Sequence, residues 1–138
     1  MQLISAMKAA VPPTATAAEP FNTQQTYHVQ ENVMIHVIAT AYIDKGRRQE
    51  FIRAFNVNIP NVLAEKGCIQ YTPTVDFVSG IDRQIPPEED TVVIIEQWET
   101  IEDLENHLVA SHMSEYRDRV KDMVRSVELR ITTSQLNS

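Results

Sequence analysis

The sequence predicts an α+β fold of the ferredoxin-like type, with the element order β-α-β-β-α-β. Two observations support this class. Four stretches are rich in β-branched residues or alternate as strands do, and two stretches carry apolar residues at helical spacing. The 138 residues are enough for one compact domain and too few for two ordinary ones. We expect this domain to occupy residues 34–133, between an irregular N-terminal arm at 1–33 and a C-terminal tail at 134–138.

The first strand and the first helix are predicted from their apolar patterns. Residues 34–43 are apolar on both alternating faces, which is typical of a strand covered on both sides. Residues 47–66 place their large apolar side chains within a single arc of a helical wheel, and Gly67 is positioned to end that helix. Pro60 lacks a backbone N–H, so it should kink the helix or split it after Ile59.

Two further strands follow. Residues 68–78 alternate, and Pro73 indicates an edge position or a bulge because it cannot donate to a neighbouring strand. A polar loop at 79–90 leads into the β-branched stretch 91–99. Alternation along this strand places four side chains on one face: Val92, Ile94, Glu96 and Trp98.

The C-terminal part predicts helix and then strand. Thr100 is a candidate N-cap, and Asp103 three residues later gives a weak capping box. The helix that follows buries Ile101, Leu104 and Leu108. It continues, after a break, as a helical stretch at 113–124, and residues 126–133 form the last strand.

The corner between the third strand and the second helix carries the best candidates for catalysis: Glu96, Trp98, His107 and His112. A histidine can act as a base near neutral pH. An indole N–H or a second imidazole can donate a hydrogen bond to a developing oxyanion. On the helical wheel His112 falls inside the apolar arc, whereas His107 lies about 90° from its centre.

Three further side chains are candidates for substrate binding. Tyr71 and Tyr116 would supply aromatic walls to a pocket, although each could instead be ordinary core. His36 lies on the first strand, on the face that carries Ile38. That face would be either the interior of a barrel or the seam of a dimer.

Each catalytic candidate also has a structural interpretation. Trp98 could be a sheet residue buried under a helix, with its N–H bonded locally. Glu96 could pair with an arginine such as Arg130. His107 could be exposed on the flank of its helix, and His112 could be a core residue or a helix C-cap.

The composition argues against several classes of partner. The net charge is −7, so nucleic acid and anionic membranes are not expected partners. No apolar run approaches the roughly 20 residues of a membrane span. No nucleotide-binding glycine pattern occurs, and the single cysteine, Cys68, cannot form a disulfide within the chain or a zinc cluster. We expect a cytoplasmic location, since Lys8 interrupts the apolar part of a weak export signal at residues 1–17.

The oligomeric state is predicted from the apolar character of the sheet. Two helical segments can cover one face of a four-stranded sheet, yet the predicted strands are apolar on both faces. A bare apolar face of that size is unfavourable in water. We therefore expect a homodimer in which two sheets pack face to face.

Four short runs of the sequence resemble the antibiotic biosynthesis monooxygenase superfamily: IPNVLAEKGC at 59–68, VIIEQWE at 93–99, LENHL at 104–108 and SHM at 111–113. Within that superfamily they are most similar to quinol monooxygenases of the YgiN type. The resemblance covers residues 34–132 and implies a dimeric α+β barrel. It also implies oxidation of a quinol or another electron-rich aromatic by O₂, with no metal or organic cofactor.

Other functions stay open within this fold. One branch of the superfamily degrades heme with an asparagine on the first strand and a histidine on the last helix. Here those positions are Ala39 and a residue near Arg117, which argues against heme. A second alternative is a non-catalytic dimer that binds a small quinone. A third is an isomerase of a small hydroxy-ketone signal.

Overall fold

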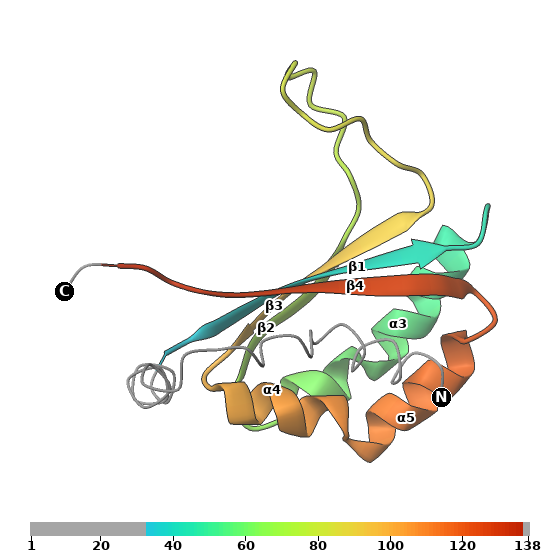
Figure 1. The fold of residues 1–138 in the computed structure, drawn as a ribbon. Helices are drawn as coiled ribbons and strands as arrows, with labels where there is room; N and C mark the ends of the chain where they lie inside the picture. The colour runs from blue at the N-terminus through green and yellow to red at the C-terminus, as the bar shows by residue number, and fades with distance from the viewer. Residues whose placement is uncertain (1–32, 137–138) are drawn as a thin grey trace, which may run out of the picture.

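The computed structural model of the chain describes residues 33–136. It contains β1 (Ile35–Ile43), α3 (Arg48–Leu63), β2 (Cys68–Thr74), β3 (Thr91–Trp98), α4 (Ile101–Leu108), α5 (Ser111–Val120) and β4 (Val124–Thr133). The strands form one antiparallel sheet in the order β2-β3-β1-β4, and the helices cover one of its faces (Figure 1). This confirms the ferredoxin-like class, with the second helical segment divided into α4 and α5. The predicted arm at 1–33, apart from its last residue, and residues 137–138 of the predicted tail lie outside the described residues.

The hydrophobic core lies between the sheet and the helices. Alternate residues of β1 face the helices and are buried, and the register pairs Ala39 with Ile94 of β3 and with Leu129 of β4. The predicted face of β3 is the buried one. The core side of the sheet therefore combines rows of apolar side chains from adjacent strands, with two small alanines, Ala39 and Ala41, in the middle of β1.

The first helix differs from expectation at Pro60. The structure keeps one continuous helix from Arg48 to Leu63, so the split predicted after Ile59 does not occur. Pro60 lies in the last turn, where its missing N–H removes a single hydrogen bond, the one to the carbonyl of Asn56, and the helix continues past it. Its own carbonyl still accepts a hydrogen bond from Ala64 N–H at 3.2 Å.

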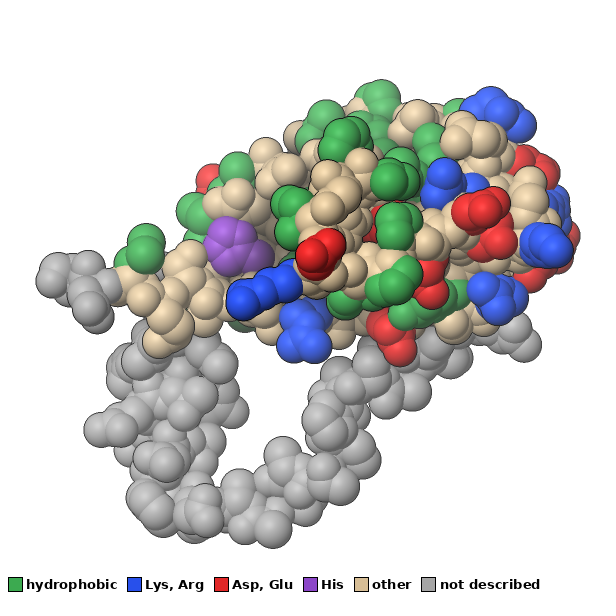
Figure 2. All heavy atoms as spheres, turned by 90° about the horizontal axis from the view of Figure 1, so that it is seen from above, with side chains coloured by type: hydrophobic (Ala, Val, Ile, Leu, Met, Phe, Trp, Pro, Cys, Tyr) green, Lys and Arg blue, Asp and Glu red, His purple; other side chains and the backbone are tan. Residues whose placement is uncertain are grey.

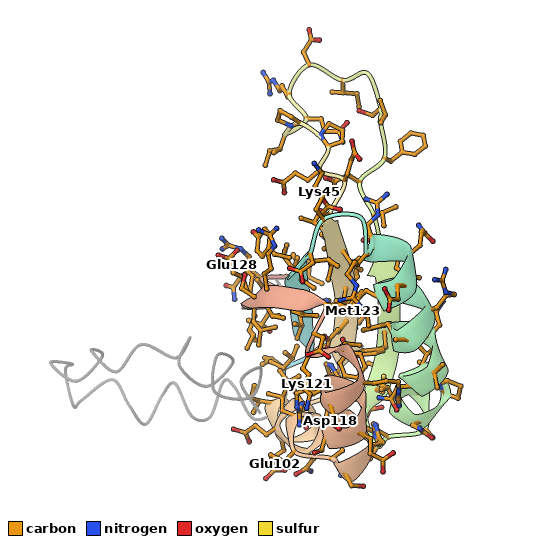
Figure 3. The ribbon with its side chains drawn as sticks, turned by 90° about the vertical axis from the view of Figure 1, so that its right-hand side faces the viewer. Lys45, Glu102, Asp118, Lys121, Met123 and Glu128 are labelled. Carbon is orange, nitrogen blue, oxygen red and sulfur yellow. The ribbon has the colours of Figure 1, made fainter. Side chains whose placement is uncertain are left out.

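Two element boundaries were also predicted wrongly. Strand β2 ends at Thr74 instead of at residue 78, because residues 75–90 leave the sheet as a long loop that stands away from the domain (Figure 3). Helix α5 ends at Val120 instead of at 124. There the carbonyl of Met123 accepts a hydrogen bond from the Asp44 N–H at 2.8 Å, which ties the turn between α5 and β4 to the end of β1.

The N-terminus of α4 follows the predicted capping pattern. The side chain of Thr100 accepts a hydrogen bond from the Asp103 N–H at 3.0 Å, which satisfies one of the free donors of the first turn. Pro73 lies on the edge strand β2, as its missing donor predicts. The predicted break in the second helical stretch falls at residues 109–110.

The face of the sheet opposite the helices is less apolar than the sequence suggested. On the central strands it carries Ile38, which is 39% exposed, and the half-buried Val93 and Ile95. The flanking strands contribute polar side chains such as Glu128 and Arg130. Figure 2 looks down on this side, where hydrophobic side chains gather between charged ones at the margins.

The loop at 75–90 also exposes apolar side chains, including Phe77, Val78 and Ile85, each about four-fifths exposed. Figure 1 shows that this loop rises from the sheet on the side away from the helices. Among residues 33–136, no helix has the length and the apolar character needed to cross a membrane.

Candidate active site

A cavity of about 40 Å³ lies between the sheet and the helices. Its floor is β1, where Ala39 and Ala41 leave space that larger side chains would fill. Most of its lining is apolar. The lining side chains that can exchange or donate a proton come from five different positions: Tyr71, Glu96, His107, Tyr116 and Arg117.

The mouth of the cavity is formed by β4 and by the end of α4. Leu108, Val127 and Leu129 line the cavity and are only half-buried, whereas the side chains deeper inside are buried. A cavity on the order of 150 Å³ is needed to hold a benzene ring. The described conformation therefore has room for a few water molecules or for O₂, and an aromatic ring must displace side chains at the mouth.

His107 is held in a single orientation. It is 1% exposed and lies between two aromatic rings, 4.8 Å from Trp98 and 5.3 Å from Tyr71 between ring centroids. Its Nδ1 lies 3.0 Å from Oε2 of Glu65. Because an ionised carboxylate can only accept, Nδ1 carries the proton and donates, which leaves the lone pair on Nε2.

Burial lowers the pKa of His107 from its ordinary value, and the neighbouring Glu65 opposes that shift. The ring is consequently neutral at neutral pH. A neutral imidazole with a fixed tautomer, in the wall of an apolar cavity, is equipped to take a proton from a bound molecule.

His112 lies outside the cavity and contacts the same carboxylate. Its Nε2 is 2.8 Å from Oε2 of Glu65, although the ring is not oriented for an aligned hydrogen bond. The side-chain amide of Asn58 donates to Nδ1 of His112 at 3.1 Å, and Asn61 donates to the oxygen of Asn58 at 3.0 Å. His112 and Asn58 thus help to fix Glu65, which in turn orients His107.

Glu96 is a buried carboxyl group in the cavity wall. The indole N–H of Trp98 donates to its Oε1 at 2.9 Å. Burial raises the pKa of Glu96 to about 7, although the hydrogen bond from Trp98 opposes the shift. Near neutral pH this group is present in both protonation states, so it can either give or take a proton.

Of the candidates predicted from the sequence, the structure brings Glu96, His107, Tyr71 and Tyr116 together around the cavity. Burial raises the pKa of both tyrosines, so their hydroxyls stay protonated and can donate. Arg130, considered as a partner of Glu96, shares the face of Ile38 and is on the opposite side of the sheet.

The other three candidates do not line the cavity. Trp98 is fully buried and lies against His107, with its N–H bonded to Glu96. His112 acts from outside, on Glu65. His36 is on the open face of the sheet, where its Nε2 lies 3.1 Å from Oγ of Ser134.

Three residues of the site were missed: Glu65, Asn58 and Arg117. Two of them carried a signal in the sequence. Asn58 falls on the buried face of α3, and Arg117 on the buried face of α5, at helical positions where all other members are apolar or aromatic. Glu65 follows the end of α3 in an irregular turn, where no periodicity marks it.

Within residues 33–136, no group of three or more histidine, cysteine, aspartate or glutamate side chains is arranged to hold a metal ion. The Cys68 thiol is a poor ligand and nucleophile as it stands, because burial raises its pKa to about 11.

Comparisons with known proteins agree with one another. The sequence profile of a family described as antibiotic biosynthesis monooxygenase matches residues 34–127. The Escherichia coli K12 protein named "Probable quinol monooxygenase YgiN" is 40% identical over 100 residues, which cover 71% of this chain and 95% of that protein. The same protein of Shigella flexneri matches equally.

Solved structures show the same fold. A crystal structure from Caulobacter crescentus CB15, described as a candidate antibiotic biosynthesis monooxygenase, matches with a TM-score of 0.67 at 17% identity, and covers 81% of this chain and 99% of that chain. A similarly described protein from Nitrosomonas europaea matches with a TM-score of 0.64 at 18% identity, over 75% of this chain and 92% of that one.

Proposed function

Because the chain belongs to the antibiotic biosynthesis monooxygenase family, we propose that it oxidises a quinol, or another electron-rich aromatic, with O₂ and without a metal or organic cofactor. The family and the relative from Escherichia coli support monooxygenase activity in general. The observation that carries the finer proposal is the contact between His107, a buried residue in the wall of the apolar cavity, and the half-buried Glu65 behind it.

The first step is removal of a proton. O₂ has two unpaired electrons and reacts slowly with closed-shell molecules, whereas a quinol that has lost a phenolic proton can give it one electron directly. Nε2 of His107 accepts that proton, and the carboxylate of Glu65 stabilises the resulting imidazolium. The hydroxyls of Tyr71 and Tyr116 donate to the oxygen anion of the substrate.

The second step joins oxygen to the ring. Transfer of one electron gives a semiquinone and superoxide, which combine at a ring carbon to form a peroxide. Cleavage of the O–O bond with loss of water leaves a hydroxyquinone, so that one quinol and one O₂ give one hydroxyquinone and one water. Glu96, whose pKa is raised to about 7, supplies a proton to the departing oxygen. The apolar walls limit the escape of reduced oxygen.

We also propose that the protein is a homodimer formed through the open face of the sheet. The exposed Ile38, together with Val93 and Ile95, gives this face an apolar centre. The loop at 75–90 projects from the same side and exposes Phe77 and Ile85, which a second copy would cover. The cytoplasmic location expected from the sequence stays a prediction.

Oxygen uptake tests the proposed reaction. With a menadiol-like hydroquinone, the protein should consume O₂ faster than the hydroquinone alone does at the same pH, and hydroxyquinone should accumulate. Uptake no faster than the non-enzymatic rate would reject this substrate class. The same experiments distinguish the two alternative functions. A non-catalytic quinone-binding protein would show saturable binding without turnover, and an isomerase of a hydroxy-ketone would work under strict anaerobiosis.

A further inference from the structure

Arg117 is a buried cation that has no charged partner among residues 33–136. The side chain comes from α5, is 2% exposed and lines the cavity. Its Nε and one terminal nitrogen are shielded from solvent and make no hydrogen bond. Among the ion pairs of residues 33–136, none involves this guanidinium.

The nearby acids do not compensate for it. Asp118, the next residue on α5, pairs with Lys121 at 2.9 Å, and both side chains lie on the outside of the helix (Figure 3). Glu96 is the one carboxyl among the cavity-lining residues, and its hydrogen bond is to Trp98. Glu65 is in contact with His107 and His112. All three acids are thus engaged elsewhere.

A buried guanidinium without a counter-charge is unfavourable in the protein when no ligand is bound. Removing a guanidinium from water without an opposite charge is strongly unfavourable. Burial lowers the pKa of Arg117, but an arginine stays protonated at neutral pH. The unpaired Nε–H and terminal N–H groups lie on two edges of the planar guanidinium, and each can donate a charge-assisted hydrogen bond to the oxygen of an anion such as a carboxylate.

We propose that Arg117 is an anion-binding subsite that accepts a carboxylate carried by the aromatic substrate. The cavity of about 40 Å³ has room for a carboxylate but not for a ring. The ring would lie in the mouth, against the apolar side chains of Leu108, Val127 and Leu129. A substrate anchored in this way is an aromatic acid whose ring projects toward β4. This inference rests on the proposed function only for the identity of the ring.

A matched pair of compounds that need not be oxidised tests the subsite by binding. Calorimetry would give the Kd of 1-hydroxy-2-naphthoate and of 1-naphthol, which share the ring and the phenol but differ in the carboxylate. The wild-type protein should bind the acid roughly tenfold tighter or more, as expected for hydrogen bonds between charged groups. Arg117→Met should abolish that preference and leave the Kd of 1-naphthol unchanged.

Arg119→Met is the control, because Arg119 is an exposed arginine on the same helix, and it should keep the preference. Equal binding of the two compounds by the wild-type protein would overturn the proposal. So would a preference that survives Arg117→Met, or an equal loss of affinity for both compounds in that variant, since Arg117 would then recognise the phenol oxygen.

A third arm covers the possibility that Arg117→Met does not fold. High concentrations of phosphate should weaken binding of the acid to the wild-type protein and not of 1-naphthol, and no such competition would count against the subsite. Failure of the proposed oxidation would be seen separately, as preferential binding of the acid without any O₂ uptake from a quinol.

Discussion

Oε2 of Glu65 lies 3.0 Å from Nδ1 of His107, so a residue just beyond the end of α3 fixes the tautomer of a histidine on α4. The pair resembles the carboxylate and histidine of a catalytic triad in its physical role, because the carboxylate orients the ring and stabilises its protonated form. The contact also gives the buried Nδ1–H an acceptor, which makes it tolerable for the polar ring of His107 to be only 1% exposed.

Glu65→Gln should lower kcat for oxygen uptake by roughly 10- to 100-fold, because an amide cannot stabilise the imidazolium as a carboxylate does. The pKa of His107 should fall further, since Glu65 raises it in the wild-type protein. The acid limb of the pH profile of kcat should therefore move to lower pH. Glu105→Gln, a change of an exposed acid on α4, is the control. A variant with an unchanged rate and an unchanged limb would show that Glu65 does not act through His107.

Glu96→Gln should change how stability depends on pH. The pKa of Glu96 is raised from 4.5 to about 7 in the folded protein, so between these values the folded state holds a proton that the unfolded state has released. Stability of the wild-type protein must then fall as pH rises through this window, by about 3 kcal/mol in all. Glu96→Gln has no group that titrates in this window. Its free energy of unfolding, measured with urea, should therefore rise relative to that of the wild type from pH 4.5 to 8. A difference in free energy of unfolding between variant and wild type that does not change with pH would contradict the raised pKa of Glu96.

Much of the fold was predictable because alternation and helical spacing report directly on burial. The buried face of β3, with Glu96 and Trp98, followed from period two alone. The site was harder to predict, because Glu65, in the turn after α3, and His107, on α4, are far apart in the sequence and are brought together only by the tertiary fold. The helical wheel placed His112 more centrally than His107, yet His107 is 1% exposed, whereas the side chain of His112, beyond the break at residues 109–110, is 22% exposed.

Gly67 should tolerate substitution less well than Gly46. Both have a positive φ, of 80° and 81°, so an alanine at either position is strained by on the order of 1 kcal/mol. A Cβ at Gly67 would also collide with the carboxylate of Asp103, whereas a Cβ at Gly46 would meet open space. Thermal unfolding should show Gly67→Ala to be less stable than Gly46→Ala by a further 1–3 kcal/mol, roughly. Equal losses would argue against close packing of Gly67 on α4.

Light scattering at micromolar concentration should report a dimer for the wild-type protein. Ile38→Asp places a charge at the apolar centre of the open face and should shift the protein toward monomer, because an unpaired buried charge is unfavourable in an interface. Val57→Asp changes an exposed apolar residue on α3, on the other side of the molecule, and should leave the mass unchanged. A wild-type protein that scatters as a monomer would refute the sheet-to-sheet dimer.

The central claim is that His107 is the base that starts oxidation of the quinol. The most direct measurement is kcat/KM for oxygen uptake with a menadiol-like hydroquinone by His107→Gln, beside His112→Gln as the matched change outside the cavity. We predict a loss of roughly 100-fold or more for His107→Gln, the range expected for an acid–base group, and a smaller loss for His112→Gln. A His107→Gln variant that is folded and oxidises the quinol at the wild-type rate would contradict the account.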